Sequence, residues 1–159
     1  MALYLIQHGK SLSKDQDPDQ GLSAEGIAET ERIAKLAKDT DVTVSQIRHS
    51  VKTRARQTAE IFAAALNPTQ GIQEVSGIKP LDDVAAYAAD IDPSEDIMLV
   101  GHLPFMERMT AFLITGSIDK PVFKFQNSGI VCLDKDPEAQ AWVILWALLP
   151  KIGQGRRKL

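Results

Sequence analysis

Short, uninterrupted apolar runs alternate along the chain with longer segments in which apolar residues recur every three or four positions. Runs of the first kind predict strands buried on both faces, and segments of the second kind predict helices that bury one face. The predicted strands are Leu3–Ile6, Val42–Ile47, Ile72–Val75 and Ile97–Val100, and near the end of the chain Gly129–Leu133 and Ala141–Leu148. The predicted helices begin at Ser23, Thr53, Asp82 and Pro104 and end near Lys38, Leu66, Ala89 and Gly116. This alternation favours an α/β fold of three layers, a sandwich of helices around a mainly parallel sheet.

Ser23 is a suitable N-cap for the first helix. The residues expected to face the core from this helix are Ile27, Thr30, Ile33, Ala34 and Ala37. Val122–Phe125 predicts a short extended segment, and Asp134–Pro137 predicts the turn between the last two strands. Because 159 residues are about one domain's length, we expect a single domain over 1–150 and a basic, solvated tail over 151–159.

Composition narrows the class of protein. The chain carries 18 basic and 21 acidic residues, a net charge of −3, whereas a generic nucleic-acid binder has a basic surplus. A single cysteine excludes an intramolecular disulfide and a multi-cysteine metal site. The apolar runs are too short to span a membrane, and the first ten residues lack the features of a signal peptide. We therefore expect a cytoplasmic protein that binds neither nucleic acid nor membranes.

Two histidines occupy matching positions at strand ends. His8 follows the first predicted strand, and His102 follows Ile97–Val100 and one glycine. Ligands bind at the carboxyl edge of open α/β sheets, so both rings are expected to face one crevice. A third strand end leads through Ser50 into a helix whose first turn carries Arg54. A guanidinium at a helix N-terminus favours anions, and with two imidazoles it predicts a phosphate pocket containing a nitrogen nucleophile.

Several other residues have simpler interpretations. His49 is expected at the surface near the rim of this pocket. Cys132 lies in a predicted strand and is expected to pack in the core. The segment 127–129, Asn-Ser-Gly, is compatible with a turn or with a border of the pocket. The three histidines lack ligand spacing, so we expect no metal, and no motif for an organic cofactor is present.

Four segments resemble, in order, the motifs of the histidine phosphatase superfamily, and within it the small SixA-type phosphohistidine phosphatases. They are LYLIQHG at 3–9 for the R-H-G signature, GLSAEG at 21–26 for L-[ST]-x-x-G, SVKTRARQTA at 50–59 for S-x-x-x-R-A-x-Q-T-A, and VGH at 100–102 for the second histidine. The resemblance implies a phosphoglycerate mutase-like fold. It also implies that His8 is the catalytic nucleophile and that the catalytic residues Arg54 and His102 belong to the phosphate pocket. Beside them, we expect Gln7, Gly9, Lys10 and Ser50 to bind the substrate.

The chain departs from this family at the nucleophile. Gln7 stands where the family has arginine, and Lys10 stands where it usually has glutamate. A charge-assisted bond from the missing arginine would contribute about 1.5–3 kcal/mol, whereas a glutamine amide donates without a charge. Two nearby cations, Lys10 and Lys52, are candidates to replace it, and our hypothesis favours Lys10. The alternative for Lys10 is a solvated loop lysine.

The general acid is the least determined role. Larger relatives use a carboxylate, and the candidates here are Asp82 and Asp83, either of which also suits a helix cap. A phosphoramidate releases an imidazole that solvent can protonate, so a dedicated acid is dispensable for such a substrate.

The resemblance implies an enzyme of signal transduction that hydrolyses phosphohistidine on a partner protein through a phosphohistidine intermediate, without cofactor. The chain is also too short between Arg54 and His102 for the cap that encloses small metabolites in larger relatives, which suits a protein substrate. Two alternatives remain: a phosphomonoesterase for a small metabolite, and a non-catalytic module that binds phosphate or phosphoproteins.

Overall fold

The computed structural model describes residues 1–152, and its centre is a six-stranded sheet with the order β3-β2-β4-β1-β5-β6. The strands are β1 (Ala2–Gln7), β2 (Gln46–His49), β3 (Ile72–Glu74), β4 (Ile97–Gly101), β5 (Ile130–Asp136) and β6 (Ala141–Leu148). The first four strands are parallel, β5 pairs antiparallel with β1, and β6 pairs antiparallel with β5 at the edge of the sheet. The predicted mainly parallel sheet is therefore confirmed.

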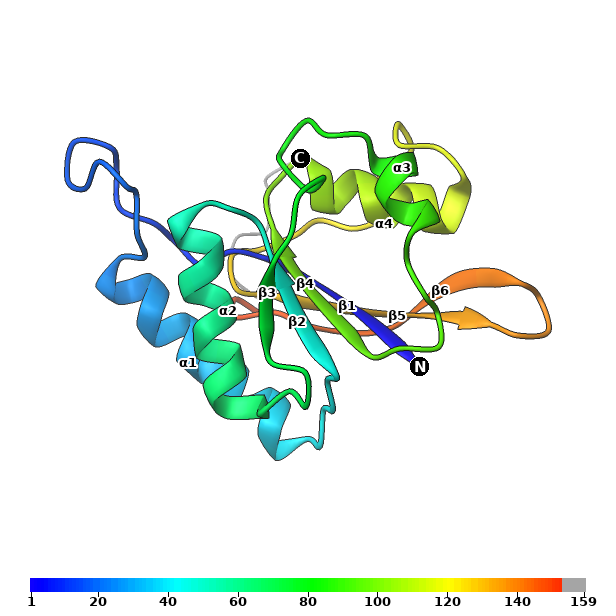
Figure 1. The fold of residues 1–159 in the computed structure, drawn as a ribbon, viewed down its shortest axis with the longest axis horizontal. Helices are drawn as coiled ribbons and strands as arrows, with labels where there is room; N and C mark the ends of the chain where they lie inside the picture. Colours follow the sequence, from blue (N-terminus) through cyan, green and yellow to red (C-terminus); the bar gives the residue numbers. More distant parts are fainter. Residues whose placement is uncertain (153–159) are drawn as a thin grey trace.

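Four helices cover the sheet: α1 (Ala24–Asp39), α2 (Thr53–Leu66), α3 (Val84–Ala89) and α4 (Phe105–Thr115). Figure 1 shows α1 and α2 on one face and α3 and α4 on the other, so the three-layer prediction is also confirmed. Ser23 caps α1 as predicted, because its side chain accepts a hydrogen bond from the backbone of Gly26.

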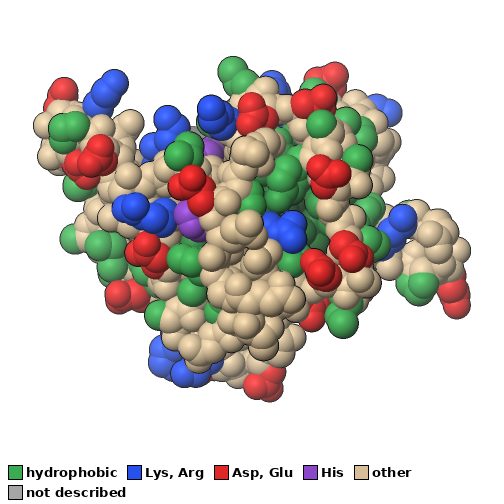
Figure 2. Space-filling view, viewed as in Figure 1, with side chains coloured by type: hydrophobic (Ala, Val, Ile, Leu, Met, Phe, Trp, Pro, Cys, Tyr) green, Lys and Arg blue, Asp and Glu red, His purple; other side chains and the backbone are tan. Residues whose placement is uncertain are grey.

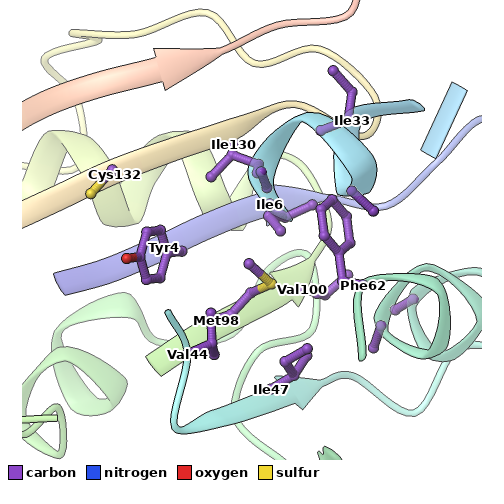
Figure 3. Packing of buried hydrophobic residues seen from close by; sticks show 14 residues of the cluster. Tyr4, Ile6, Ile33, Val44, Ile47, Phe62, Met98, Val100, Ile130 and Cys132 are labelled. Atoms are coloured by element: carbon purple, nitrogen blue, oxygen red, sulfur yellow. The ribbon is translucent and has the colours of Figure 1, made fainter. Parts of the chain in front are cut away.

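Two hydrophobic clusters fill the spaces between the layers. In the first, Phe62 of α2 and Ile33 of α1 pack with Ile6 and Val100 of the sheet (Figure 3). The second cluster lies on the opposite face and includes Phe105 and other residues of α4. Side chains from both faces of β1 and β4 are buried, which explains why the sequences of these strands are uninterrupted apolar runs.

Three predictions of local structure are wrong. Ile27 is 40% exposed, because the buried stripe of α1 runs through 26, 30, 33 and 37 and Ile27 lies one position off it. Strand β2 begins only at Gln46, because the amide of Val42 bonds Ala37 O at the end of α1 rather than a neighbouring strand. Strand β5 continues to Asp136, through most of the segment 134–137 predicted as a turn, and the turn lies at 137–140 instead.

Cys132 is buried in the first cluster, as expected. No helix within residues 1–152 is long and apolar enough to cross a membrane. Of the predicted tail over 151–159, residues 153–159 lie outside the described residues. Its first residue, Lys151, exchanges hydrogen bonds with Gln126.

Candidate active site

Three neighbouring strands end together at the candidate site. In the parallel register, Gln7 of β1 pairs with Gly101 of β4, and His49 of β2 pairs with Val100. The next residues along β1 and β4 are His8 and His102, whose ring centroids lie 5.1 Å apart. The sheet thus brings the two histidines together at its carboxyl edge, where α/β proteins bind ligands.

The His8 ring is held with one nitrogen free. Its Nδ1 lies 2.7 Å from the carbonyl oxygen of Gly9. A carbonyl only accepts, so Nδ1 carries the proton and Nε2 of the neutral ring keeps its lone pair. Burial lowers the pKa of His8, and the nearby charge of Arg54 lowers it further, although the bond to Gly9 opposes them. The ring is therefore neutral at neutral pH, and the lone pair on its Nε2 is available.

Hydrogen bonds from three directions fix the backbone around His8. The amide of Gly9 donates to Thr58 Oγ1 of α2 at 2.9 Å, and Asn127 Nδ2 donates to the carbonyl of His8 at 2.9 Å. The amide of His8 donates to Gly101 O. The sequence did not indicate a role for Thr58, and it was compatible with either a turn or a border of the pocket for the segment that contains Asn127. The motif segment 50–59, which includes Thr58, was the signal that could have identified it.

His102 is 2% exposed, and its Nε2 forms a hydrogen bond of 2.5 Å with Ser50 Oγ. Its Nδ1 is buried and has no hydrogen-bond partner within residues 1–152. Burial, reinforced by His8, Arg54 and Lys52, lowers the pKa of His102 to about 3. The unliganded ring is therefore neutral, and it can become cationic only when an anion offsets these effects.

This burial makes stability depend on pH. His102 binds a proton near pH 6.5 in the unfolded chain and only near pH 3 in the folded one. Between these values the unfolded state holds more protons, so the free energy of unfolding falls on acidification by up to about 1.4 kcal/mol per pH unit. Denaturant unfolding without phosphate should show this slope, and His102→Gln should flatten it. Equal slopes in the two proteins would contradict the assignment.

Arg54 lies in the first turn of α2 and is half-buried. Burial lowers the pKa of its guanidinium, and its charge acts on the rings of both His8 and His102. The guanidinium forms no ion pair within residues 1–152. A half-buried cation beside two neutral imidazoles lacks a counterion, so the site is suited to an anion.

The two residues that depart from the family pattern lie in different environments. Gln7 precedes His8, and its Oε1 is buried without a hydrogen-bond partner within residues 1–152. Lys10 is exposed, and its Nζ lies 2.7 Å from Glu25 Oε2. The cations that act on the pKa of the two rings are Arg54 and Lys52, and not Lys10. The geometry does not favour the hypothesis that Lys10 replaces the arginine.

The two candidate acids have local roles. Asp83 caps α3 by accepting from the amide of Ala86, and Asp82 accepts from the amide of Lys79 at 2.9 Å. Neither carboxylate acts on the pKa of His8 or His102, so the structure does not bring either into the group around the rings. The carboxylate that lines a hollow of about 450 Å³ beside Ser50 belongs instead to Glu74.

The prediction that His49 lies at the surface is wrong. The residue is 4% exposed, and its Nδ1 forms a hydrogen bond with the carbonyl oxygen of Ser50. Gly9 is buried as well, and it has no space for a side chain, since a Cβ at this position would lie 2.7 Å from Thr30 Oγ1. No group of three or more metal-ligating side chains is positioned for a metal ion in residues 1–152. Figure 2 shows histidine surface beside Lys and Arg side chains, next to the protruding loop at its upper left.

Comparison with known proteins identifies related sequences. Residues 3–82 match the sequence model of the histidine phosphatase superfamily (branch 1). An uncharacterised protein of Picosynechococcus is 33% identical over 113 residues, which cover 65% of this chain and 67% of that protein. The phosphohistidine phosphatase SixA of Escherichia coli is 24% identical over 141 residues, covering 85% of this chain and 87% of that one.

The fold is similar to solved structures. The structure of the protein histidine phosphatase SixA complexed with tungstate superimposes with a TM-score of 0.80, at 24% sequence identity. The match covers 94% of this chain and 97% of that chain. The overall architecture described above is therefore shared with this phosphatase.

Proposed function

Because the chain belongs to the histidine phosphatase superfamily (branch 1), whose members are phosphatases, we propose that it removes the phosphoryl group from phosphohistidine on a partner protein. The proposed nucleophile is His8, and Arg54 and His102 are the proposed phosphoryl-binding side chains. Gln7, Gly9 and Ser50 complete the proposed site around the phosphoryl group.

The observation that carries the proposal is the electrostatic state of the site. Arg54, a half-buried guanidinium without an ion pair in residues 1–152, acts on the partly buried ring of His8 and the buried ring of His102, and the pKa values of both rings are lowered. A phosphoryl dianion supplies the missing negative charge and, by its own field, favours the protonated form of His102. The neutral His8 is then the group able to attack, because its Nε2 carries a lone pair.

In the first step, the lone pair of His8 Nε2 attacks phosphorus in line. A new N–P bond forms while the P–N bond of the substrate breaks, and its electron pair passes to the leaving imidazole, which takes a proton. Arg54 and protonated His102 stabilise the charge on the equatorial oxygens, which is the main source of catalysis in phosphoryl transfer.

In the second step, water attacks the phosphorylated His8. An O–P bond forms, the N–P bond breaks, and its electron pair returns to Nε2. The water loses one proton to solvent, and inorganic phosphate leaves. The hydrogen bond from Nδ1 to Gly9 keeps the regenerated ring in the tautomer that begins the next cycle.

The surroundings of the site favour a phosphoramidate on a protein. An imidazole can leave after protonation by solvent, so the reaction does not require Asp82 or Asp83, both of which accept hydrogen bonds from backbone amides. The hollow beside Ser50 is open to the surface and is lined by Val51, Val75 and other residues, so it offers space for side chains next to the phosphohistidine of a partner protein.

The test is to trap the intermediate. The protein is mixed with a small phosphoramidate and quenched in alkali, and acid-labile phosphate is located by mass spectrometry. We expect the label on residue 8, and turnover of a phosphohistidine protein that exceeds turnover of sugar phosphates. His8→Ala should carry no label, whereas His49→Gln, a change at a buried histidine next to the site, should retain it.

Two results would contradict this function. A preference for sugar phosphates over phosphoramidates would indicate a phosphomonoesterase for small metabolites. Phosphate binding with neither label nor phosphate release would indicate a binding module in which Gln7 marks lost chemistry.

A further inference from the structure

The proposed site has fewer permanent positive charges than its ligand has negative charges, because His102 is neutral until an anion binds. A phosphoryl dianion brings two negative charges, and Arg54 supplies one permanent positive charge among the groups around the rings. Gln7, directly before His8, is neutral, and its Oε1 is a buried acceptor without a partner in the described chain. An additional cation within reach of the phosphoryl oxygens would balance the ligand.

Lys52 lies at the position from which such a cation can reach the site. It follows Ser50, whose hydroxyl contacts His102, by two residues, and it precedes Arg54 by two. Lys52 is the N-cap residue of α2, and its side chain is exposed. Its charge acts on the ring of His102, where it contributes to the low pKa.

The Lys52 ammonium is also uncommitted. Within residues 1–152 it forms no ion pair, whereas Lys10 is paired with Glu25. Helix α2 begins without a side-chain cap and without an acidic residue in its first turn, unlike α1, which has both Ser23 and Glu25. The positive end of α2 thus carries Lys52 and Arg54, both of which act on the ring of His102, whose buried Nδ1 has no partner within residues 1–152. No carboxylate in this part of the chain forms an ion pair with either cation.

We propose that Lys52 is the second cation of the phosphoryl site and that it supplies the charge that Gln7 lacks. This inference rests on the proposed function, since it assigns one more ligand of the same phosphoryl group. Its ammonium contacts the oxygens from the α2 side, next to Arg54, and not from the side of β1. A flexible lysine brings a point charge rather than the paired donors of an arginine.

Binding of inorganic phosphate, measured by calorimetry at low ionic strength, tests the proposal without requiring turnover. Lys52→Ala should weaken binding about tenfold, the lower end of what a charge-assisted hydrogen bond contributes. Lys52→Arg should retain affinity because it keeps the charge. Lys10→Ala is the matched control, an exposed lysine near the nucleophile whose loss should leave phosphate affinity unchanged.

A rescue experiment addresses the link to Gln7. In the Lys52→Ala background, Gln7→Arg should restore much of the lost affinity, and it should gain less when Lys52 is present. Thermal unfolding of each variant shows whether it is folded, and Lys52→Met, which keeps the apolar stem, is the second variant if Lys52→Ala is unstable.

The proposal is overturned if Lys52→Ala binds phosphate as the unmodified protein does, or if Lys10→Ala loses as much affinity. Its failure is distinguishable from failure of the proposed function. A protein that binds phosphate through Lys52 but never labels His8 would support the cation and contradict the phosphatase, and labelling with no role for Lys52 would do the reverse.

Discussion

Arg54→Ala is expected to lower kcat/KM for a phosphoramidate about 10³-fold, the size of effect seen when a donor to a developing charge or an active-site arginine is removed. The half-buried guanidinium is the permanent charge beside both rings. Without it the phosphoryl oxygens lose their main partner, and His8 lacks the group that orients the ligand. Phosphate affinity should fall together with turnover.

Steady-state kinetics and phosphate titration check this result, and Arg56→Ala and Arg54→Lys are the variants for comparison. Arg56 lies on the same helix, is exposed and pairs with Glu60 at 3.5 Å, so Arg56→Ala should change kcat/KM little. Arg54→Lys should recover only part of the loss, because a lysine cannot provide two parallel donors. Unchanged activity in Arg54→Ala would remove the electrostatic basis of the proposed function.

Gly26→Ala is expected to destabilise the fold by about 1–3 kcal/mol, the cost of overpacking a filled interior. Alanine in place of glycine inside a helix ordinarily stabilises by about 1 kcal/mol, so the expected sign is the reverse of the usual one. The reason is the backbone carbonyl of Lys10, which would collide with a Cβ at position 26. That carbonyl also accepts from the amide of Ser23 at 2.9 Å, so it cannot move without loosening the start of α1.

Denaturant unfolding measures this effect, and the control is Glu31→Ala, an exposed position on the same helix that should change stability by no more than about 0.5 kcal/mol. Because Lys10 is two residues from His8, Gly26→Ala should also lower turnover. A variant as stable as the unmodified protein would show that the loop after β1 yields easily.

The parts of the fold that depend on local pattern were predictable. The cap of α1, the bounds of α2 and the positions of His8 and His102 after buried strands all follow from neighbouring residues in the chain. Strand-end logic also predicts that the two rings meet, because parallel strands align their carboxyl ends. Which face of α1 is buried could not be predicted to within one residue. Gly26 is buried and Ile27 is exposed because of the segments that pack against the helix, and these are distant in the sequence.

The parts of the site that depend on distant contacts could not be predicted. Lys10 is paired because α1 packs its first turn, with Glu25, against the loop after β1. Asn127 reaches the carbonyl of His8 across 119 positions of sequence. In the sequence, Asp83 was compatible both with a helix cap and with a catalytic acid. Only the position of α3 in the fold distinguishes these two roles.

The hydrogen bonds around the nucleophile tie its backbone to the sheet. The amide of His8 bonds the last residue of β4, and that of Gly9 bonds a buried threonine of α2. The amide of His8 can exchange with solvent only when the ends of β1 and β4 separate, and that of Gly9 only when the loop moves away from α2, so the loop belongs to the same cooperative unit as the core. The conformational entropy of ordering this loop is therefore lost during folding, and ligand binding does not have to order it again.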